Sequence, residues 1–250
     1  MTPCLKIHQM METLAGILFL GASKRPGAFS PMPSPLEKAR KYPDSNKARI
    51  LSAARRLFGE YGFQGTTTRM IAKAVGIDIS TLYYHWGEKA DLYEAVIIDL
   101  NEGIEAQFKI IEGLARGRNL ADRLDIAIDV MCDYLHDTPD VSNLLLLGYF
   151  SKSKTDVSLD EKVAGHIANI AIAMGLAIDK QHVTPQAKAR IMTLWNAVLN
   201  FISGESFFRP ILGVDKTAYL DVVKETLKFL LIPAFTGRSG DNGSKLPENR

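Results

Sequence analysis

The sequence has little cysteine: Cys4 and Cys132 are the two cysteines among its 250 residues, and they lie far apart. Two isolated cysteines do not build a disulfide framework, and this usage is typical of a protein in a reducing cytoplasm. Cys132 and His136 lie four residues apart on a predicted helix and could share a metal ion. Two ligands do not make a metal site, so we expect no metal and no other cofactor.

Long hydrophobic runs are also absent. The apolar run from Leu14 to Ala22 is too short to cross a membrane. The following Lys24-Arg25-Pro26 does not fit the small-residue cleavage site of a secretory signal. We therefore expect a cytoplasmic protein with no membrane partner.

The first 45 residues do not fit the rest of the chain. Pro31, Pro33 and Pro35 favour an unstructured linker. We interpret residues 1–45 as an extension from a start codon placed too far upstream, with Met32 opening the natural chain. A genuine disordered arm and a membrane tether are the alternatives.

Catalytic constellations are missing as well. The sequence shows no paired carboxylates, no nucleophile with a base and no phosphate-binding loop, so we do not expect an enzyme. No alternating strand pattern competes with helical periodicity, and no internal repeat is present.

The informative segment lies between Ala48 and Leu92. Apolar residues recur from Ile50 to Tyr61 at the period of one helix face, and Gly62 can close that helix in a left-handed conformation. Thr67 is the expected cap of a second, short helix. Gly76 then permits a tight turn into a third helix from about Ile79 to Trp86, for which Asp78 is the expected cap. Three helices so joined predict a helix-turn-helix module.

This module resembles the TetR family of bacterial transcriptional regulators (TetR/AcrR-like) over its whole length. The matching positions are Tyr61-Gly62, Thr67, Ile71-Ala72, Ala74-Val75-Gly76-Ile77, Thr81-Leu82-Tyr83, His85-Trp86 and Lys89. Two positions depart from the usual pattern: Ser80 stands where Gly or Pro is frequent, and Trp86 stands where Phe is usual. Neither departure affects the expected fold, although Ser80 and its neighbour Ile79 could alter which bases are read.

A recognition helix places residues near its N-terminus against base edges, so Ile79, Ser80 and Thr81 are the expected base readers. The resemblance implies phosphate contacts for Thr67, Tyr83, His85 and Lys89, and a base or backbone contact for Arg69. Phosphate contacts position a protein, whereas base contacts specify sequence. The full set of predicted DNA contacts is Lys47, Thr67, Arg69, Ile79, Ser80, Thr81, Tyr83, Tyr84, His85 and Lys89. Several of these residues could instead serve the fold, Thr67 as a cap and Tyr84 by packing.

Charge is concentrated in the same segment. From Lys38 to Lys89 there are ten basic and four acidic residues, a balance of +6, while the whole chain carries +2. The remainder is therefore close to −4. A basic field over a recognition helix favours binding to the DNA backbone.

Beyond the module the pattern stays helical to about Leu231, so we predict an all-α protein with about nine helices. We expect a helix-turn-helix domain over residues 46–92, a ligand-binding and dimerisation domain over 93–234 and a disordered tail over 235–250. One continuous helix is expected from Pro185 to Phe208 and a last helix from Lys216 to Leu231.

The resemblance implies that the C-terminal domain binds a small effector and forms a homodimer through the last two long helices. Apolar residues on those helices are compatible with a four-helix interface, and the alternative is burial within one subunit. They are Ile191, Leu194, Trp195, Val198, Leu199 and Ile202, then Tyr219, Val222, Val223, Leu227, Leu230 and Leu231.

Polar or aromatic residues on otherwise apolar helices are candidate effector contacts. They are Tyr134, His166, Asn169, Trp195, Asn196 and Asn200. Their apolar surroundings favour a lipophilic or aromatic compound, although each residue could equally be an ordinary core residue.

The sequence thus predicts a ligand-responsive repressor that binds a palindromic operator as a dimer. Two alternatives stay open. The first is an activator or a regulator without a small ligand. The second is an all-helical carrier or enzyme with a vestigial DNA-binding head.

Overall fold

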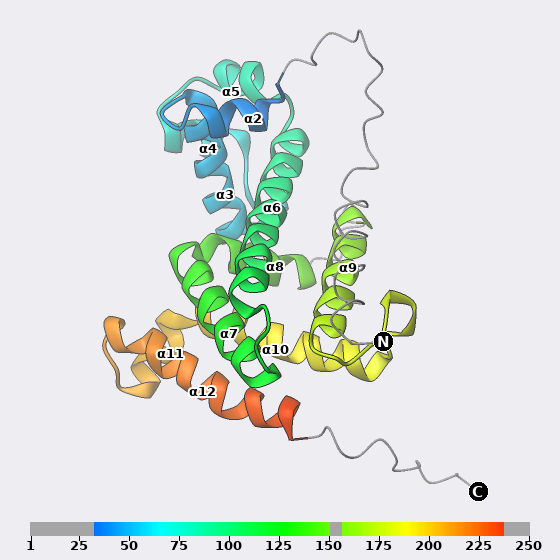
Figure 1. Ribbon diagram of the computed structural model, residues 1–250. Helices are drawn as coiled ribbons and strands as arrows, with labels where there is room; N and C mark the ends of the chain where they lie inside the picture. The colour runs from blue at the N-terminus through cyan, green and yellow to red at the C-terminus, as the bar shows by residue number, and fades with distance from the viewer. Residues whose placement is uncertain (1–32, 151–156, 238–250) are drawn as a thin grey trace, which may run out of the picture. The chain divides into compact units, whose positions relative to one another are not determined.

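The computed structural model describes residues 33–150 and 157–237, and all regular elements in these ranges are helices (Figure 1). They are α2 (Pro35–Lys41), α3 (Asn46–Gly65), α4 (Thr68–Val75), α5 (Ile79–Trp86), α6 (Lys89–Ala115), α7 (Leu120–Asp137), α8 (Pro139–Phe150), α9 (Val157–Ala173), the 3-10 turn η2 (Lys180–His182), α10 (Pro185–Ser203), α11 (Glu205–Leu212) and α12 (Lys216–Thr236). The all-α prediction is confirmed. The expectations for residues 1–32, including Cys4, and for residues 238–250 lie outside the described residues.

Eleven α-helices stand in these ranges where about nine were expected, and α2 is one reason. This helix lies inside the segment interpreted as an unstructured arm. Leu36 and Ala39 are three residues apart, share one face of the helix and are buried, and α2 packs against α3. Residues 35–41 therefore belong to the folded head, contrary to the interpretation of residues 1–45.

The second reason is a break in the helix expected over 185–208. Helix α10 ends at Ser203 and α11 begins at Glu205, with Gly204 between them. A Cβ atom at residue 204 would lie 2.4 Å from the ring of Phe208 and 2.7 Å from the carbonyl oxygen of Asn200. This corner therefore has no room for a side chain, and the chain turns there.

The last helix is longer than expected. Helix α12 continues past Leu231 to Thr236, and Pro233 lies inside it rather than after it. A proline near the end of a helix removes one backbone hydrogen bond and leaves the earlier turns intact. Residues 235 and 236, which were expected to belong to the tail, are therefore helical.

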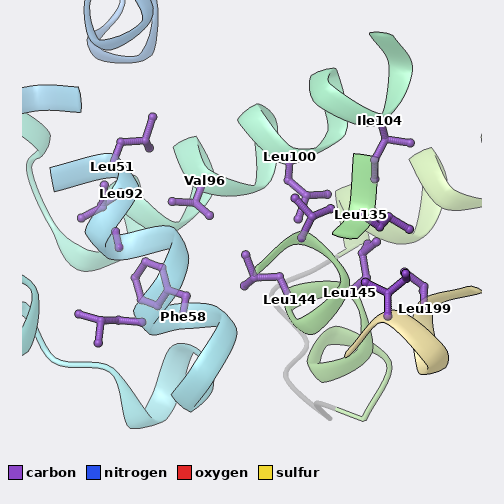
Figure 2. Close-up of a cluster of buried hydrophobic side chains, with 14 of the residues drawn as sticks. Leu51, Phe58, Leu92, Val96, Leu100, Ile104, Leu135, Leu144, Leu145 and Leu199 are labelled. Carbon is purple, nitrogen blue, oxygen red and sulfur yellow. The ribbon is translucent and has the colours of Figure 1, made fainter. Parts of the chain in front are cut away.

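One continuous apolar core joins the head helices to α6, α7, α8, the later part of α10 and α12 (Figure 2), and a second, smaller cluster lies on α9 and the start of α10. Leu92, Val96, Leu100 and Ile104 recur every fourth residue along α6, and all are buried. Figure 2 shows this row beside Phe58 of α3 at one end and Leu135, Leu144, Leu145 and Leu199 of α7, α8 and α10 at the other. Because one face of α6 contacts both groups, the helix links the head mechanically to the C-terminal helices.

The C-terminal helices use much of their apolar surface inside the subunit. Of the residues expected at a dimer interface, seven are buried: Ile191, Val198, Leu199, Ile202, Tyr219, Val223 and Leu227. Burial within one subunit is therefore correct for these positions. Other large apolar side chains of α10, α11 and α12 are exposed, namely Met192, Phe207, Ile211, Leu212, Phe229 and Leu230.

Ion pairs hold α12 against α7. Lys224 pairs with Asp133, and Lys228 pairs with Asp125 at 3.0 Å and with Asp129 at 2.7 Å. The inward face of α12 is the one that carries the buried Tyr219, Val223 and Leu227. Within the described ranges, no helix combines the length and the apolar character needed to span a membrane.

Candidate nucleic-acid interface

The turn between α3 and α4 is built by glycine and threonine. Gly62 takes a left-handed conformation with φ of 69°, as predicted, and a short further turn runs to Gly65. Thr66 is fully buried, and its hydroxyl lies 2.9 Å from the carbonyl oxygen of Leu57 and 2.8 Å from that of Gly62. Thr67 then caps α4 by accepting a hydrogen bond from the amide of Met70 at 3.2 Å, which confirms its predicted role as a cap.

The turn between α4 and α5 follows the same logic. Gly76 is left-handed, with φ of 76°, and its amide donates to the carbonyl of Ala72 at 2.9 Å. Asp78 occupies the N-cap position of α5, but its side chain makes no capping hydrogen bond. The predicted position is right and the predicted bond is absent. Leu82 is fully buried, so α5 is oriented mainly by packing of its inner face.

Lys47 and Trp86 lock the end of the recognition helix to the start of α3. The indole nitrogen of Trp86 donates to the carbonyl of Lys47 at 3.1 Å, and the Lys47 ammonium donates to the carbonyl of His85 at 2.6 Å. A cation at a helix C-terminus also interacts favourably with the helix dipole. Lys47, a predicted DNA contact, is therefore used in positioning α5.

Lys89 also holds one helix of the head in position. Its ammonium donates to the carbonyls of Phe63 at 2.9 Å and Thr66 at 3.1 Å, and it lies 4.1 Å from the centre of the Phe63 ring. A lysine has three N–H donors, so one is left for a phosphate. The lysine fixes the start of α6 against the α3–α4 turn.

Arg49 was not predicted as a site residue. Its guanidinium donates to the carbonyl of Val75 at 2.7 Å, and so caps the end of α4. The pairing joins residues far apart in sequence, and no local spacing indicates it. Part of the positive charge counted in this segment is thus directed at carbonyl groups rather than at solvent.

The remaining predicted DNA contacts differ in how exposed their side chains are. Thr67, Arg69, Ser80, Tyr83 and Tyr84 are exposed, with Tyr84 84% and Tyr83 41% accessible. Their polar groups are available to a ligand on the outside of α4 and α5. This face joins the N-terminal end of the recognition helix to the cap of the preceding helix.

Ile79, Thr81 and His85 are half-buried. The side chain of Ile79 packs against the apolar core. The Nδ1 atom of His85 is buried without a hydrogen-bond partner among the described residues. Burial and the nearby charge of Lys47 lower the pKa of His85 below its ordinary value. His85 is therefore neutral at pH 7, and its side chain is a polar group rather than a cation.

The predicted effector contacts are distributed over several environments. Asn196 and Asn200 donate to carbonyls one turn earlier in their own helix, at 2.8 and 2.9 Å. His166 lies 3.6 Å from Glu105 and against the ring of Phe108.

Tyr134, Trp195 and Asn169 are half-buried. Trp195 packs against the main core. The hydroxyl of Tyr134 reaches the backbone of α6, since a Cβ atom at Gly103 would lie 2.4 Å from it. The six residues are not brought around one described cavity, and their role in binding stays a prediction.

Cys132 and His136 do not form a pair. Cys132 is fully buried, and desolvation raises the pKa of its thiol to about 12, so it is uncharged at neutral pH. His136 lies 3.7 Å from Glu205 instead. Among the residues that the structure describes, no three His, Cys, Asp or Glu side chains cluster as metal ligands would.

A helix-turn-helix head with an exposed recognition helix, joined to a larger helical body, defines a DNA-binding transcription regulator. Residues 50–96 match the model of the bacterial regulatory proteins of the tetR family. Residues 50–96 are therefore similar to the DNA-binding domain of the TetR family.

Relatives extend the match beyond the head. The chain is 24% identical over 192 residues to the biofilm operon icaADBC HTH-type negative transcriptional regulator IcaR of Staphylococcus aureus, which covers 74% of this chain and 98% of IcaR. It is 39% identical over 69 residues to the HTH-type transcriptional regulator UidR of Escherichia coli, covering 27% of this chain and 35% of UidR.

Solved structures share the fold at lower identity. A TetR-like transcriptional regulator from Rhodococcus aligns with a TM-score of 0.55 at 14% identity, covering 76% of this chain and 95% of that one. A putative fatty acid metabolism regulator from Clostridium perfringens aligns with the same TM-score at 16% identity, covering 74% and 96%.

Proposed function

We propose that this regulator is a cytoplasmic repressor that binds a palindromic operator as a homodimer and leaves it when a small lipophilic effector binds. In this proposal residues 46–92 form the DNA-binding domain and residues 93–234 the effector-binding and dimerisation domain. The observation that carries the proposal is the exposed row of Ser80, Tyr83 and Tyr84 on a recognition helix whose inner face is fully packed.

This row has the chemistry of a major-groove reader. Ser80 lies in the first turn of α5, where a hydroxyl reaches base edges, and Tyr83 lies one turn later, where a phenol reaches phosphate. Thr67 and Arg69 add polar groups from the start of α4. Ile79 and Thr81, being half-buried, are proposed to contribute less to base recognition than Ser80.

A homodimer follows from reading two half-sites and from the apolar surface of the last helices. On α12, Phe229 and Leu230 are 77% and 58% exposed, and on α11, Phe207 and Ile211 are 67% and 68% exposed. Exposed apolar side chains in such number are typical of an interaction surface. We propose that a second copy covers them.

Repression and effector release rest on two further supports. IcaR is described as a negative regulator. The buried row of α6 contacts both the head and the C-terminal helices, so a ligand that displaces α6 would displace the head. A ligand can act only through different affinities for the two arrangements. A lipophilic effector is proposed because the helices of the body are largely apolar.

DNA binding is tested by selecting operator duplexes from random sequence with the wild-type protein. Ser80→Ala and Tyr84→Ala should each weaken binding to the selected duplex about tenfold, by loss of a base or flanking contact. Lys188→Ala, an exposed lysine on α10, is the matched control and should bind normally. If neither head variant loses affinity for the duplex, the assignment of this face to DNA binding is wrong.

Effector release is tested separately with saturated fatty acids of increasing length. A compound that raises the melting temperature of the protein should also weaken operator binding. If compounds that bind the body leave operator binding unchanged, ligand-controlled release is wrong while the DNA-binding role stands.

A further inference from the structure

We infer that Asp99 of α6 is a positioning residue that sets the angle of the DNA-binding head, and thereby the half-site spacing that the dimer accepts. The inference rests on the proposed dimeric reading of a palindrome. It assigns a spacing-determining role to a carboxylate on α6, outside the recognition helix.

Asp99 accepts hydrogen bonds from two arginines, which lie on two different helices of the head. Arg40 of α2 donates to its Oδ1 atom through Nε at 2.9 Å and through Nη2 at 2.7 Å. Arg55 of α3 approaches the Oδ2 atom through Nη1 at 3.4 Å. One carboxylate thus bridges both head helices to α6, and fork-like guanidinium contacts of this kind restrict direction as well as distance.

Each arginine also has a second acid on the body. Arg40 donates to Glu102, one turn further along α6, and Arg55 donates to Asp140 in the first turn of α8. The head is therefore tied to two body helices at once. Rotation of the head about α6 would break at least one of these contacts.

We call the group of Arg40, Arg55, Asp99, Glu102 and Asp140 the clamp, and its arm through Arg55 is partly withdrawn from water. The side chains of Asp99 and Asp140 are 17% and 18% exposed, and that of Arg55 is 29% exposed. Screening by solvent and salt is weaker at such positions than between exposed charges. We therefore expect the contacts of Arg55 with Asp99 and Asp140 to be less screened than the exposed pair Arg56–Glu60 on the same head.

Backbone contact reinforces the clamp beside Asp140. A Cβ atom at Gly59 of α3 would lie 3.2 Å from the carbonyl oxygen of Asp140, so α3 and α8 pack closely at this point. Helix α8 in turn contacts α10. The hydroxyl of Ser203 on α10 donates to that of Ser142 on α8 at 2.9 Å. Helix α10 leads directly into α11, whose exposed apolar side chains are proposed to face the second copy.

In a two-fold dimer both heads rotate alike. The separation of the two recognition helices therefore changes by twice the displacement of one head. One base pair of spacing moves a half-site by about 3.4 Å and rotates it by roughly 35°. A head held at a fixed angle should therefore reject such a change, and a loosened head should accept it.

The experiment measures binding of the full-length protein to duplexes carrying two selected half-sites, with the spacer lengthened or shortened by one and two base pairs. Wild type should lose about tenfold or more in affinity per base pair away from the preferred spacer, because the duplex must twist to fit. Asp99→Asn should reduce this penalty to about threefold or less, which a merely structural loss would not do. Glu60→Gln removes the exposed pair of the same head and should keep the wild-type profile.

A uniform loss of affinity on all spacers in Asp99→Asn would show a structural role and overturn the inference. If that variant does not fold by circular dichroism, Arg40→Gln, on the more exposed arm of the clamp, replaces it and should flatten the profile partly; an unchanged profile overturns the inference. Wild type that accepts all spacers equally would overturn the proposed two-site reading together with the clamp. A sharp profile in both wild type and the variants would overturn the clamp alone.

Discussion

The helix-turn-helix head and the region from α10 to α12 differ in how much of their surface is covered by the same chain. In the head, the ends of the helices are closed by side chains of the same chain: Lys47, Arg49 and Lys89 all donate to backbone carbonyls. In α11 and α12, Phe207 and Phe229 remain largely in solvent. The head is complete in one copy of the chain, apart from the face that we assign to DNA.

The difference indicates which surface each region presents to a partner. A head whose inner surface is closed can offer a rigid polar face, and rigid polar faces are suited to DNA. Exposed aromatic and aliphatic side chains on α11 and α12 are suited instead to another apolar surface. The following predictions test this contrast, beginning with the largest expected effect.

Phe58→Ala should destabilise the protein most. Phe58 is fully buried, its ring lies 5.1 Å from that of Tyr93, and its removal leaves a cavity at the base of the head. We expect a loss of about 3–5 kcal/mol in the free energy of unfolding, measured by urea denaturation. Tyr84→Ala, at an exposed position, should change it by less than about 0.5 kcal/mol. Equal effects would mean that the head is not closed by its own core.

Phe229→Glu should separate the two copies without unfolding either. A charge placed at the centre of an apolar interface opposes association, and sedimentation should show a monomer. Affinity for the two-site operator should fall about a hundredfold, since the second half-site no longer binds intramolecularly.

Ile178→Glu is the matched control for that variant. Ile178 is 86% exposed but lies outside α10, α11 and α12. It should remain dimeric. A dimeric Phe229→Glu protein with normal operator affinity would contradict our assignment of this face.

Lys89→Met should have an intermediate effect. It removes two hydrogen bonds to carbonyls and the contact with the ring of Phe63, and we expect a loss of about 1–3 kcal/mol in the free energy of unfolding. Lys73→Met, at an exposed position on α4, should be close to neutral. If both lysines behave alike, the head is not held by its carbonyl contacts.

The smallest effect concerns pH. Because the folded pKa of His85 is below its unfolded value near 6.5, the unfolded chain takes up the proton first. Stability from this residue is present above about pH 6.5 and is lost as pH falls below it. The melting temperatures of wild type and His85→Gln should therefore run parallel from pH 8 to 7, and wild type should fall more steeply toward pH 5. Parallel curves over the whole range would show that His85 is not perturbed.

The turns that join α3, α4 and α5 could be predicted because their determinants are local. Gly62 and Gly76 need positive φ, Thr67 caps the helix that follows it, and the spacing of Leu82 and Trp86 defines an inner face. Helix α2 was missed because its short apolar face follows a run of prolines and gains stability only by packing on α3. The split at Gly204 was missed because the crowding there involves Phe208, which is positioned by the tertiary fold.

The use of individual side chains was harder to predict. Lys47 and Lys89 are predicted DNA contacts, and the structure directs both ammonium groups to backbone carbonyls. The apolar faces of α10 and α12 looked like one interface, and most of those residues are buried inside the subunit.

By itself, the sequence determined the helical class, the joints of the DNA-binding head and the polar residues on its recognition helix. These properties follow from periodicity, from glycine conformation and from capping, all of which act within a few residues. Only the tertiary structure decided that Asp99 bridges α2 and α3, that Arg49 closes α4, and which apolar side chains of α11 and α12 stay in solvent. Those facts depend on the distance between residues remote in sequence, and packing of the whole core sets that distance.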